Sequence, residues 1–154
     1  MNHKSKKGFT LIEMLIVIAI ISILASVFLV GLRGFRAGAY DARRLADLQK
    51  VQSYLEIYYT KNRAYPNVSA TTASGWISLQ NELVSADVGV TAIPNDPLSG
   101  SGLYYYYGVD GDLQSYVLGA KLTQGHSAYN EPTTEKTSTY NVPCDGSTIF
   151  CIRF

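Results

Sequence analysis

The residues best suited to chemistry lie near the start of the chain, in the stretch 6–13, which reads Lys-Lys-Gly-Phe-Thr-Leu-Ile-Glu. An apolar run, residues 14–32, follows it without a charge or a proline. A carboxylate near a membrane centre costs roughly 2.5–3.5 kcal/mol on insertion scales and less towards the interface, so Glu13 calls for a partner. Cleavage after Gly8 would create one, the new α-amine of Phe9. An amine and a carboxylate spaced in this way can pair between neighbouring helices in a stack of identical subunits.

The element that must position these groups is the apolar run itself. As a helix rising 1.5 Å per residue it covers roughly 28 Å, close to the hydrocarbon thickness of a bilayer. A secretory signal peptide would have a shorter apolar segment that ends at a small-residue cleavage site. Here the small residue, Gly8, precedes the run. We therefore predict a membrane-spanning helix at about 14–32.

The basic leader, the fixed offset of Gly8, Phe9 and Glu13, and the long apolar run together resemble the class III signal of type IV pilins and type II secretion pseudopilins. The resemblance implies that a prepilin peptidase cuts between Gly8 and Phe9 and N-methylates Phe9. It also implies that Glu13 supports assembly. The alternative is an uncleaved anchor with an incidental glutamate. We expect Glu13 to distinguish the two, because a mere tether has no use for it.

Helical periodicity continues beyond the apolar run, and no proline occurs between Phe9 and Pro66. Apolar residues recur three or four positions apart and predict one buried stripe: Leu45, Leu48, Val51, Leu55 and Tyr58. The charged residues are assigned to the remaining helix surface: Arg43, Arg44, Asp47, Lys50 and Glu56. We predict one helix over residues 9–63.

Three glycines, Gly31, Gly34 and Gly38, lie where the two halves of this helix join. Many pilins carry a proline where this chain has Val30, so the chain departs from the family pattern there. The glycines either loosen the helix locally or allow helices to pack closely, and the sequence leaves both readings open.

The remaining chain predicts a small domain, residues 64–154, after the leader at 1–8 and the helix at 9–63. Tyr65-Pro66 ends the helix, and Trp76, Leu79 and Leu83 are spaced for a short amphipathic helix. An Asp-Gly-Asp turn at 110–112 joins two β-forming runs, and 148–154 predicts a last strand. The fold class is α+β: a long N-terminal helix, membrane-spanning in its first half, with a small antiparallel sheet packed on its second half.

This domain is similar to that of the major pseudopilin, whereas the pair Cys144 and Cys151 resembles the C-terminal disulfide loop of type IV pilins. A location outside the cytoplasm favours a disulfide between them. A metal site would need further ligands, and no other Cys or His lies nearby.

Some close relatives bind calcium through C-terminal aspartates, which makes calcium an alternative to having no cofactor. The candidates are Asp96, Asp110, Asp112 and Asp145. Their spacing is not that of an EF-hand, and the hairpin turn alone accounts for Asp110 and Asp112.

The charge balance argues against nucleic acid or an anionic surface as the partner of the domain. Net charge is +1, and three of the 13 basic residues are leader lysines, so 10 remain against 12 acidic residues. Positive segments stay cytoplasmic, so the leader is expected inside and the domain outside the cytoplasmic membrane. Four arginines oppose this orientation: Arg33, Arg36, Arg43 and Arg44. The tyrosine run 104–107 is either a stacking platform for single-stranded DNA or one buried and one outer sheet face, and we favour the sheet.

The residues show no catalytic triad, phosphate loop or nucleotide fingerprint, so we do not expect an enzyme. The resemblance implies a structural subunit that polymerises with itself. The subunit is expected first in the cytoplasmic membrane and then in a filament in the periplasm or at the cell surface. Implied partners are prepilin peptidase, an inner-membrane assembly platform and minor pilins or pseudopilins. Surface pilus and secretion pseudopilus both remain open. The alternative function is a membrane-tethered binding protein, such as a DNA-binding pilin.

Overall fold

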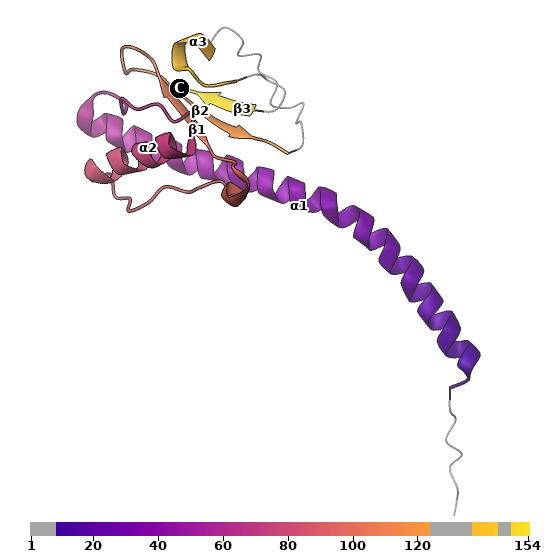
Figure 1. The fold of residues 1–154 in the computed structure, drawn as a ribbon. Coiled ribbons are helices and arrows are strands. Elements are labelled where there is room, and N and C mark those ends of the chain that lie inside the picture. The colour runs from indigo at the N-terminus through magenta and orange to yellow at the C-terminus, as the bar shows by residue number, and fades with distance from the viewer. Residues whose placement is uncertain (1–8, 124–136, 145–148) are drawn as a thin grey trace, which may run out of the picture. The chain divides into compact units, whose positions relative to one another are not determined.

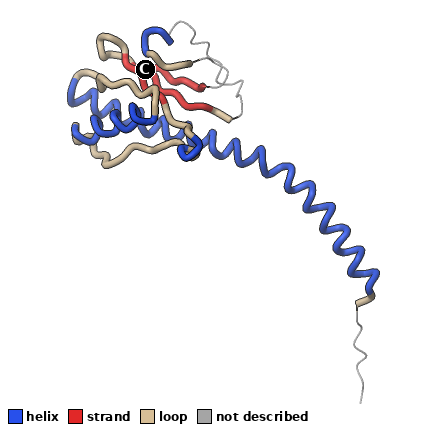
Figure 2. The backbone as a smooth tube through the Cα atoms, in the orientation of Figure 1, coloured by secondary structure: helices blue, strands red, loops and turns tan. Residues whose placement is uncertain are grey.

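The computed structural model describes residues 9–123, 137–144 and 149–154, and only the backbone of residues 27–33, 137 and 138. The chain divides into two compact units, Met1–Arg36 and Ala37–Phe154. The described elements follow one another as shown in Figures 1 and 2: α1 Leu11–Asn62, α2 Ala73–Ser85, η1 Ser99–Ser101, β1 Tyr106–Val109, β2 Tyr116–Lys121, α3 Thr137–Tyr140 and β3 Ile149–Arg153. The α+β prediction is confirmed.

The helix α1 is 52 residues long and passes without a break through the three glycines. It ends where Arg63 takes a left-handed conformation, with φ of 59°, and donates its backbone N–H to the Tyr59 carbonyl. The prediction of one helix is confirmed to within two residues at each end. Whether the glycines loosen it or aid packing stays open.

In the first unit, the large apolar side chains between Phe9 and Leu24 are 46–83% exposed. Among the described residues, no helix is both long enough and apolar enough to cross a membrane. Part of the spanning segment predicted at 14–32 lies outside the described side chains, which omit residues 27–33.

The core of the second unit lies between α1, α2 and one face of the sheet. On α1, Leu48, Val51, Leu55 and Tyr58 are buried as predicted, whereas Leu45 is only half-buried. The opposing layer comes from α2 and the sheet: Trp76, Leu79, Leu83, Tyr105, Tyr107, Tyr116 and Leu118. Helix α2 starts at the N-cap Thr72, whose hydroxyl accepts the Gly75 N–H at 3.1 Å.

The sheet is antiparallel with the order β1-β2-β3. Tyr106 pairs with Gly119 in the first ladder, and Gly119 pairs with Cys151 in the second. Of the two β-forming runs, 103–109 and 113–121, β1 takes up 106–109 and β2 takes up 116–121. The late start of β2 follows from Asp110, which organises a longer connection. Its carboxylate accepts hydrogen bonds from the Gln114 N–H and from both the N–H and the hydroxyl of Ser115.

The other face of the sheet has its own small core of Val117, Tyr140, Val142 and Cys144. Figure 1 shows α3 on this side of the sheet, with α1 and α2 on the opposite side. Gly108 permits the close approach, because a Cβ there would collide with the Tyr140 carbonyl oxygen. Residues 124–136 lie outside the described residues, and α3 follows them.

Candidate functional site

The Glu13 carboxylate closes a capping box at the start of α1. Its Oε2 accepts the Thr10 N–H at 2.8 Å and the Thr10 hydroxyl at 2.7 Å. In return, the Glu13 N–H donates to Thr10 Oγ1 at 3.3 Å. Reciprocal bonds of this kind satisfy two of the backbone donors that a helix N-terminus otherwise leaves without partners.

The expectation that a mere tether has no use for Glu13 is wrong. A tether does have a use for Glu13, because the carboxylate caps the helix within a single chain. The presence of Glu13 therefore does not by itself distinguish assembly from anchoring. Glutamine also serves at this position of a capping box, so the cap does not require the negative charge. The backbone of Phe9 and Thr10 is outside the helix, and the Phe9 side chain is 82% exposed.

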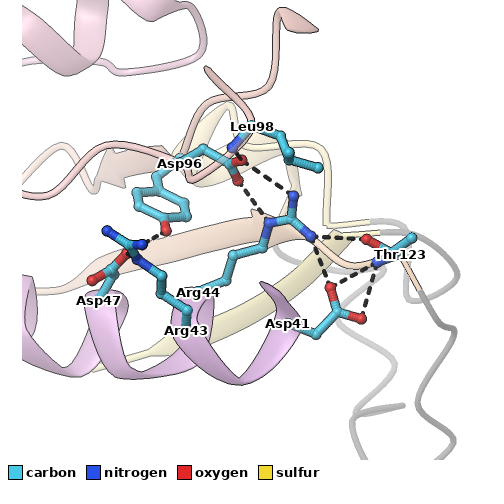
Figure 3. A network of polar contacts seen from close by, with 8 residues as sticks. Asp41, Arg43, Arg44, Asp47, Asp96, Leu98 and Thr123 are labelled. Carbon is cyan, nitrogen blue, oxygen red and sulfur yellow. Dashed lines mark hydrogen bonds and ion pairs between the residues drawn. The ribbon is translucent and has the colours of Figure 1, made fainter. Parts of the chain in front are cut away.

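A second polar site, shown in Figure 3, is centred on Arg44, whose side chain is fully buried. Its Nε and Nη2 donate to the two oxygens of Asp96, at 2.7 and 3.1 Å. Its Nη1 donates to Asp41 Oδ1 at 2.8 Å and to the Thr123 hydroxyl at 2.9 Å. The site thus joins α1 to the loop 94–98 and to the residue that follows β2 by two positions.

Burial alone would lower the pKa of Arg44, but hydrogen bonds and the charges of Asp96 and Asp41 raise it overall. The guanidinium is therefore a permanent cation, and each of its three nitrogens has an acceptor. Removing it would leave two carboxylates buried without their counter-ion. The sequence prediction that Arg44 lies on the helix surface is wrong. Its Asp96 partner is 52 residues away, which no local periodicity reveals.

Tyrosine hydroxyls hold the carboxylates that line the rest of α1. Tyr105 donates to Asp47 at 2.7 Å, and Tyr116 donates to Glu56 at 3.0 Å. Tyr105 and Tyr107 are buried against α1, whereas Tyr104 and Tyr106 are half-buried on the outer side. This alternation agrees with the favoured sheet reading for Tyr106 and Tyr107, which lie in β1, whereas Tyr104 and Tyr105 precede the strand.

Two of the four calcium candidates already have hydrogen-bond partners in the described structure. Both oxygens of Asp96 accept bonds from Arg44, and Asp110 is held by its own hairpin connection. Asp112 is exposed, and Asp145 lies outside the described residues. Within the described part of the chain, no three His, Cys, Asp or Glu side chains gather to hold a metal ion. Calcium binding stays a prediction.

Cys144 and Cys151 form the predicted disulfide. The bridge joins β3 to the segment that follows α3, with a Cα–Cα distance of 5.9 Å. It lies against the second core, where Cys144 is buried and Cys151 is packed beside it.

Comparison with known proteins places the first site in a recognised motif. Residues 3–29 match the prokaryotic N-terminal methylation motif. This match covers Gly8, Phe9, Thr10 and Glu13.

The relatives extend the similarity into the domain. The type II secretion system core protein G of Aeromonas hydrophila is 31% identical over 105 residues, covering 63% of this chain and 71% of that protein. The protein of the same name from Klebsiella michiganensis is 27% identical over 123 residues, covering 77% and 87%. The type IV wide pilus major component PilA4 of Thermus thermophilus is 42% identical over 71 residues, covering 46% and 54%. No solved structure matches the chain.

Proposed function

Because the chain belongs to the family of type IV pilins and type II secretion pseudopilins, we propose that it is the repeating subunit of a type II secretion pseudopilus. Members of this family are membrane-anchored structural subunits that self-assemble into filaments. The choice of a pseudopilus over a surface pilus rests on how much of this chain each kind of relative covers. The core protein G relatives cover up to 82% of this chain, helix and domain together, whereas PilA4 covers 46%.

A surface pilus is the second candidate. The higher identity to PilA4, 42% over 71 residues, favours it. So does the disulfide between Cys144 and Cys151, which resembles the loop of type IV pilins. Deletion of the gene separates the two: loss of secreted proteins from the medium supports the pseudopilus, and loss of surface filaments with normal secretion supports the pilus.

Processing is proposed at the Gly8–Phe9 bond, with methylation of the new Phe9 amine. The sequence motif and the non-helical backbone of Phe9 and Thr10 support this, because a peptidase needs access to extended chain. Intact-mass measurement of the membrane protein should show loss of Met1–Gly8 and one added methyl group. A mature chain that still begins at Met1 would refute the proposal.

The orientation proposed places the leader in the cytoplasm and the second unit outside. The leader lysines and the family resemblance support it, against the four arginines that follow the apolar run. Protease added to spheroplasts should digest the domain. Protection of the domain would reverse the orientation.

For assembly, we expect the Glu13 carboxylate to pair with the Phe9 amine of an adjoining subunit. In a medium of low dielectric such a pair is stronger than at a surface, although desolvation offsets much of the gain. Glu13→Gln keeps an oxygen acceptor for the Thr10 cap and removes the charge. We therefore expect Glu13→Gln and Glu13→Ala to reduce filaments and secretion strongly while membrane levels hold.

The matched control is Thr10→Ala, which removes the capping hydroxyl and keeps the Glu13 charge. This variant should still form filaments. If instead Glu13→Gln behaves like the wild type and Thr10→Ala fails, capping is the only role of Glu13 and the pairing with Phe9 is wrong.

A further inference from the structure

The outer face of the sheet is covered by residues 139–144, and this covering segment has its own small core. Tyr140, Val142 and Cys144 are buried there against Val117 of β2. The larger core between α1, α2 and the inner face of the sheet includes none of these four side chains. Because so little apolar surface is buried under it, the covering segment is the described part of the second unit that detaches most easily.

The polar contacts that hold the covering segment on the sheet are also few. The Tyr140 hydroxyl lies 2.7 Å from the Ser115 hydroxyl. The Arg153 guanidinium lies over the ring of Tyr140, 5.6 Å from its centre. One hydrogen bond between neutral side chains and one cation–π contact at the surface add little to the stability of the docked segment.

The backbone of the covering segment does not extend the sheet. Among the described residues, no backbone hydrogen bond joins it to a strand, and the Cys144 N–H donates within the segment, to the Val142 carbonyl. A cavity of about 220 Å³ also lies between residues 139–141 and the loop 67–69. The segment is therefore attached to the sheet chiefly by its side chains and by the disulfide.

The Cys144–Cys151 disulfide joins two parts of the domain that are anchored differently. Strand β3 is paired with β2 over Ile149–Arg153. Phe150 and Ile152, on the opposite face of β3 from Cys151, pack against the larger core. These contacts do not involve the bridge, whereas Cys144 belongs to the covering segment. Opening the bridge therefore releases the covering segment and leaves β3 in the sheet.

We propose that the Cys144–Cys151 bridge controls whether the outer face of the sheet is covered. In the dithiol form the covering segment leaves the sheet while the larger core and β3 stay in place, and it docks when the two thiols are oxidised. The inference rests on the orientation given under the proposed function, because thiols stay reduced in the cytoplasm and disulfides form outside it. The covering segment therefore docks only after the domain has crossed the membrane.

Docking is coupled to a thiol–disulfide exchange with a protein disulfide oxidant. One thiolate of the domain attacks a sulfur of the oxidant to form a mixed disulfide, and the other thiolate then displaces the oxidant. One S–S bond forms in the domain and one breaks in the oxidant, which leaves as a dithiol with both electrons and two protons. In the docked form Cys144 is buried and Cys151 is half-buried, so a reductant reaches the bridge through Cys151.

The test uses the full-length protein, solubilised from membranes in detergent, with and without dithiothreitol. Chymotrypsin cuts after tyrosine, and Tyr140 is only 3% exposed while the segment is docked. In the chain-entropy model, a bridge between cysteines seven positions apart shifts the equilibrium between docked and open forms by roughly 50-fold. We therefore expect reduction to speed the cut after Tyr140 by at least about tenfold, measured by the mass of the fragment that ends there. The fluorescence of Trp76, in the larger core, should stay unchanged.

Two outcomes would overturn the inference. Equal cutting rates with and without dithiothreitol would show that the non-covalent contacts are enough to hold the segment. A change in Trp76 fluorescence that accompanies the cut would show that the second unit unfolds as a whole. Neither outcome bears on filament formation, whereas protection of the domain in spheroplasts would refute the orientation in the proposed function.

Two variants separate the bridge from the hydrogen bond beside it. Cys144→Ser combined with Cys151→Ser should be cut at the reduced rate without dithiothreitol, and dithiothreitol should then change nothing. Tyr140→Phe keeps the ring and the cleavage site but loses the hydroxyl that lies against Ser115. While oxidised, this variant should be cut as slowly as the wild type. Cutting as fast as in the reduced wild type would show that the hydrogen bond, and not the bridge, holds the segment.

Discussion

Two consecutive arginines of α1 have different roles. Arg43 is 66% exposed and lies 4.0 Å from Asp47, a contact that solvent screens. Arg44 is fully buried between Asp41 and Asp96. The burial of both partners makes the second interaction costly to break, although replacing the whole group by apolar side chains need not destabilise the fold.

Replacing Arg44 by alanine should therefore lower the free energy of unfolding by about 3–5 kcal/mol, because two carboxylates lose their counter-ion. The matched variant Arg43→Ala should change the free energy of unfolding by no more than about 0.5 kcal/mol. Urea titration of the solubilised protein measures both. Equal losses from the two substitutions would show that the buried site contributes nothing specific.

At the residue scale, the sequence predicted the motif residues and the disulfide but not the buried ion pairs. Gly8, Phe9 and Glu13 are recognised by their spacing together with the basic leader and the apolar run. Arg44 differs from Arg43 through its contact with Asp41, three residues before it, and through its contacts with Asp96 and Thr123, which lie 52 and 79 residues further along the chain. Charge and helical position favoured the surface for both arginines. The partner Asp96 lies in the turn 94–97, Pro-Asn-Asp-Pro, whose sequence does not reveal that the carboxylate is buried or which cation it meets.

At the scale of elements, helices and strands are positioned by contacts at their ends. The C-terminus of α2 has no basic residue of its own, and Lys61 of α1 donates instead to the carbonyls of Ala86 and Asp87. The loop that follows is fixed by Trp76, whose indole N–H donates to the Pro94 carbonyl at 3.0 Å. These bonds orient α2 on α1 and so determine which of its faces is exposed.

Strand β1 packs closely against the end of α3 and the segment that follows it, and this packing requires glycine at position 108. We expect Gly108→Ala to lower the free energy of unfolding by about 1–3 kcal/mol, because its Cβ would overlap the Tyr140 backbone and the Val142 side chain. Gly111→Ala, where a Cβ meets no atom within 4 Å, is the control. Thermal unfolding monitored by circular dichroism distinguishes them, and an unperturbed Gly108→Ala would mean that this segment moves without cost.

Most elements follow from local pattern. The periodicity of α1, the spacing of Trp76, Leu79 and Leu83, and the last strand all predicted what the structure shows. The start of β2 did not follow, because the Asp110 carboxylate accepts the N–H groups of Gln114 and Ser115 and so holds residues 110–115 in a longer turn. Side-chain hydrogen bonds of this kind compete with strand ladders and are invisible to alternation of apolar residues.

At the scale of the whole molecule, the domain has a core rich in tyrosine whose hydroxyls are already bonded. Burial raises the pKa of Tyr65 to about 12, and the Glu56 carboxylate adds to the shift. Burial also raises the pKa of Tyr105, Tyr107 and Tyr116. The folded state therefore disfavours the phenolate at all four positions.

This shift determines how stability depends on alkaline pH. Each folded pKa lies above the ordinary value of 10, so the stabilisation is complete below pH 10 and is lost as pH rises through the folded pKa, about 12 for Tyr65. We expect the four phenols to ionise together with unfolding, above pH 10. Phenolate absorbance and circular dichroism, followed together, check this. Ionisation of every tyrosine near pH 10 with intact helix signal would contradict it.

The Arg44 site also has a mechanical consequence. Tension along α1 enters the domain near Asp41, where the guanidinium holds the loop 94–98 and Thr123 at once. If the helix slid along its axis, these hydrogen bonds would all be stretched at the same time and not one after another. The hydrogen bonds from Tyr105 to Asp47 and from Tyr116 to Glu56 resist the same movement. When a subunit is pulled by its N-terminal segment, we therefore expect its domain to unfold abruptly and only at high force. The bonds of Arg44 lie nearest to the point where the force enters the domain.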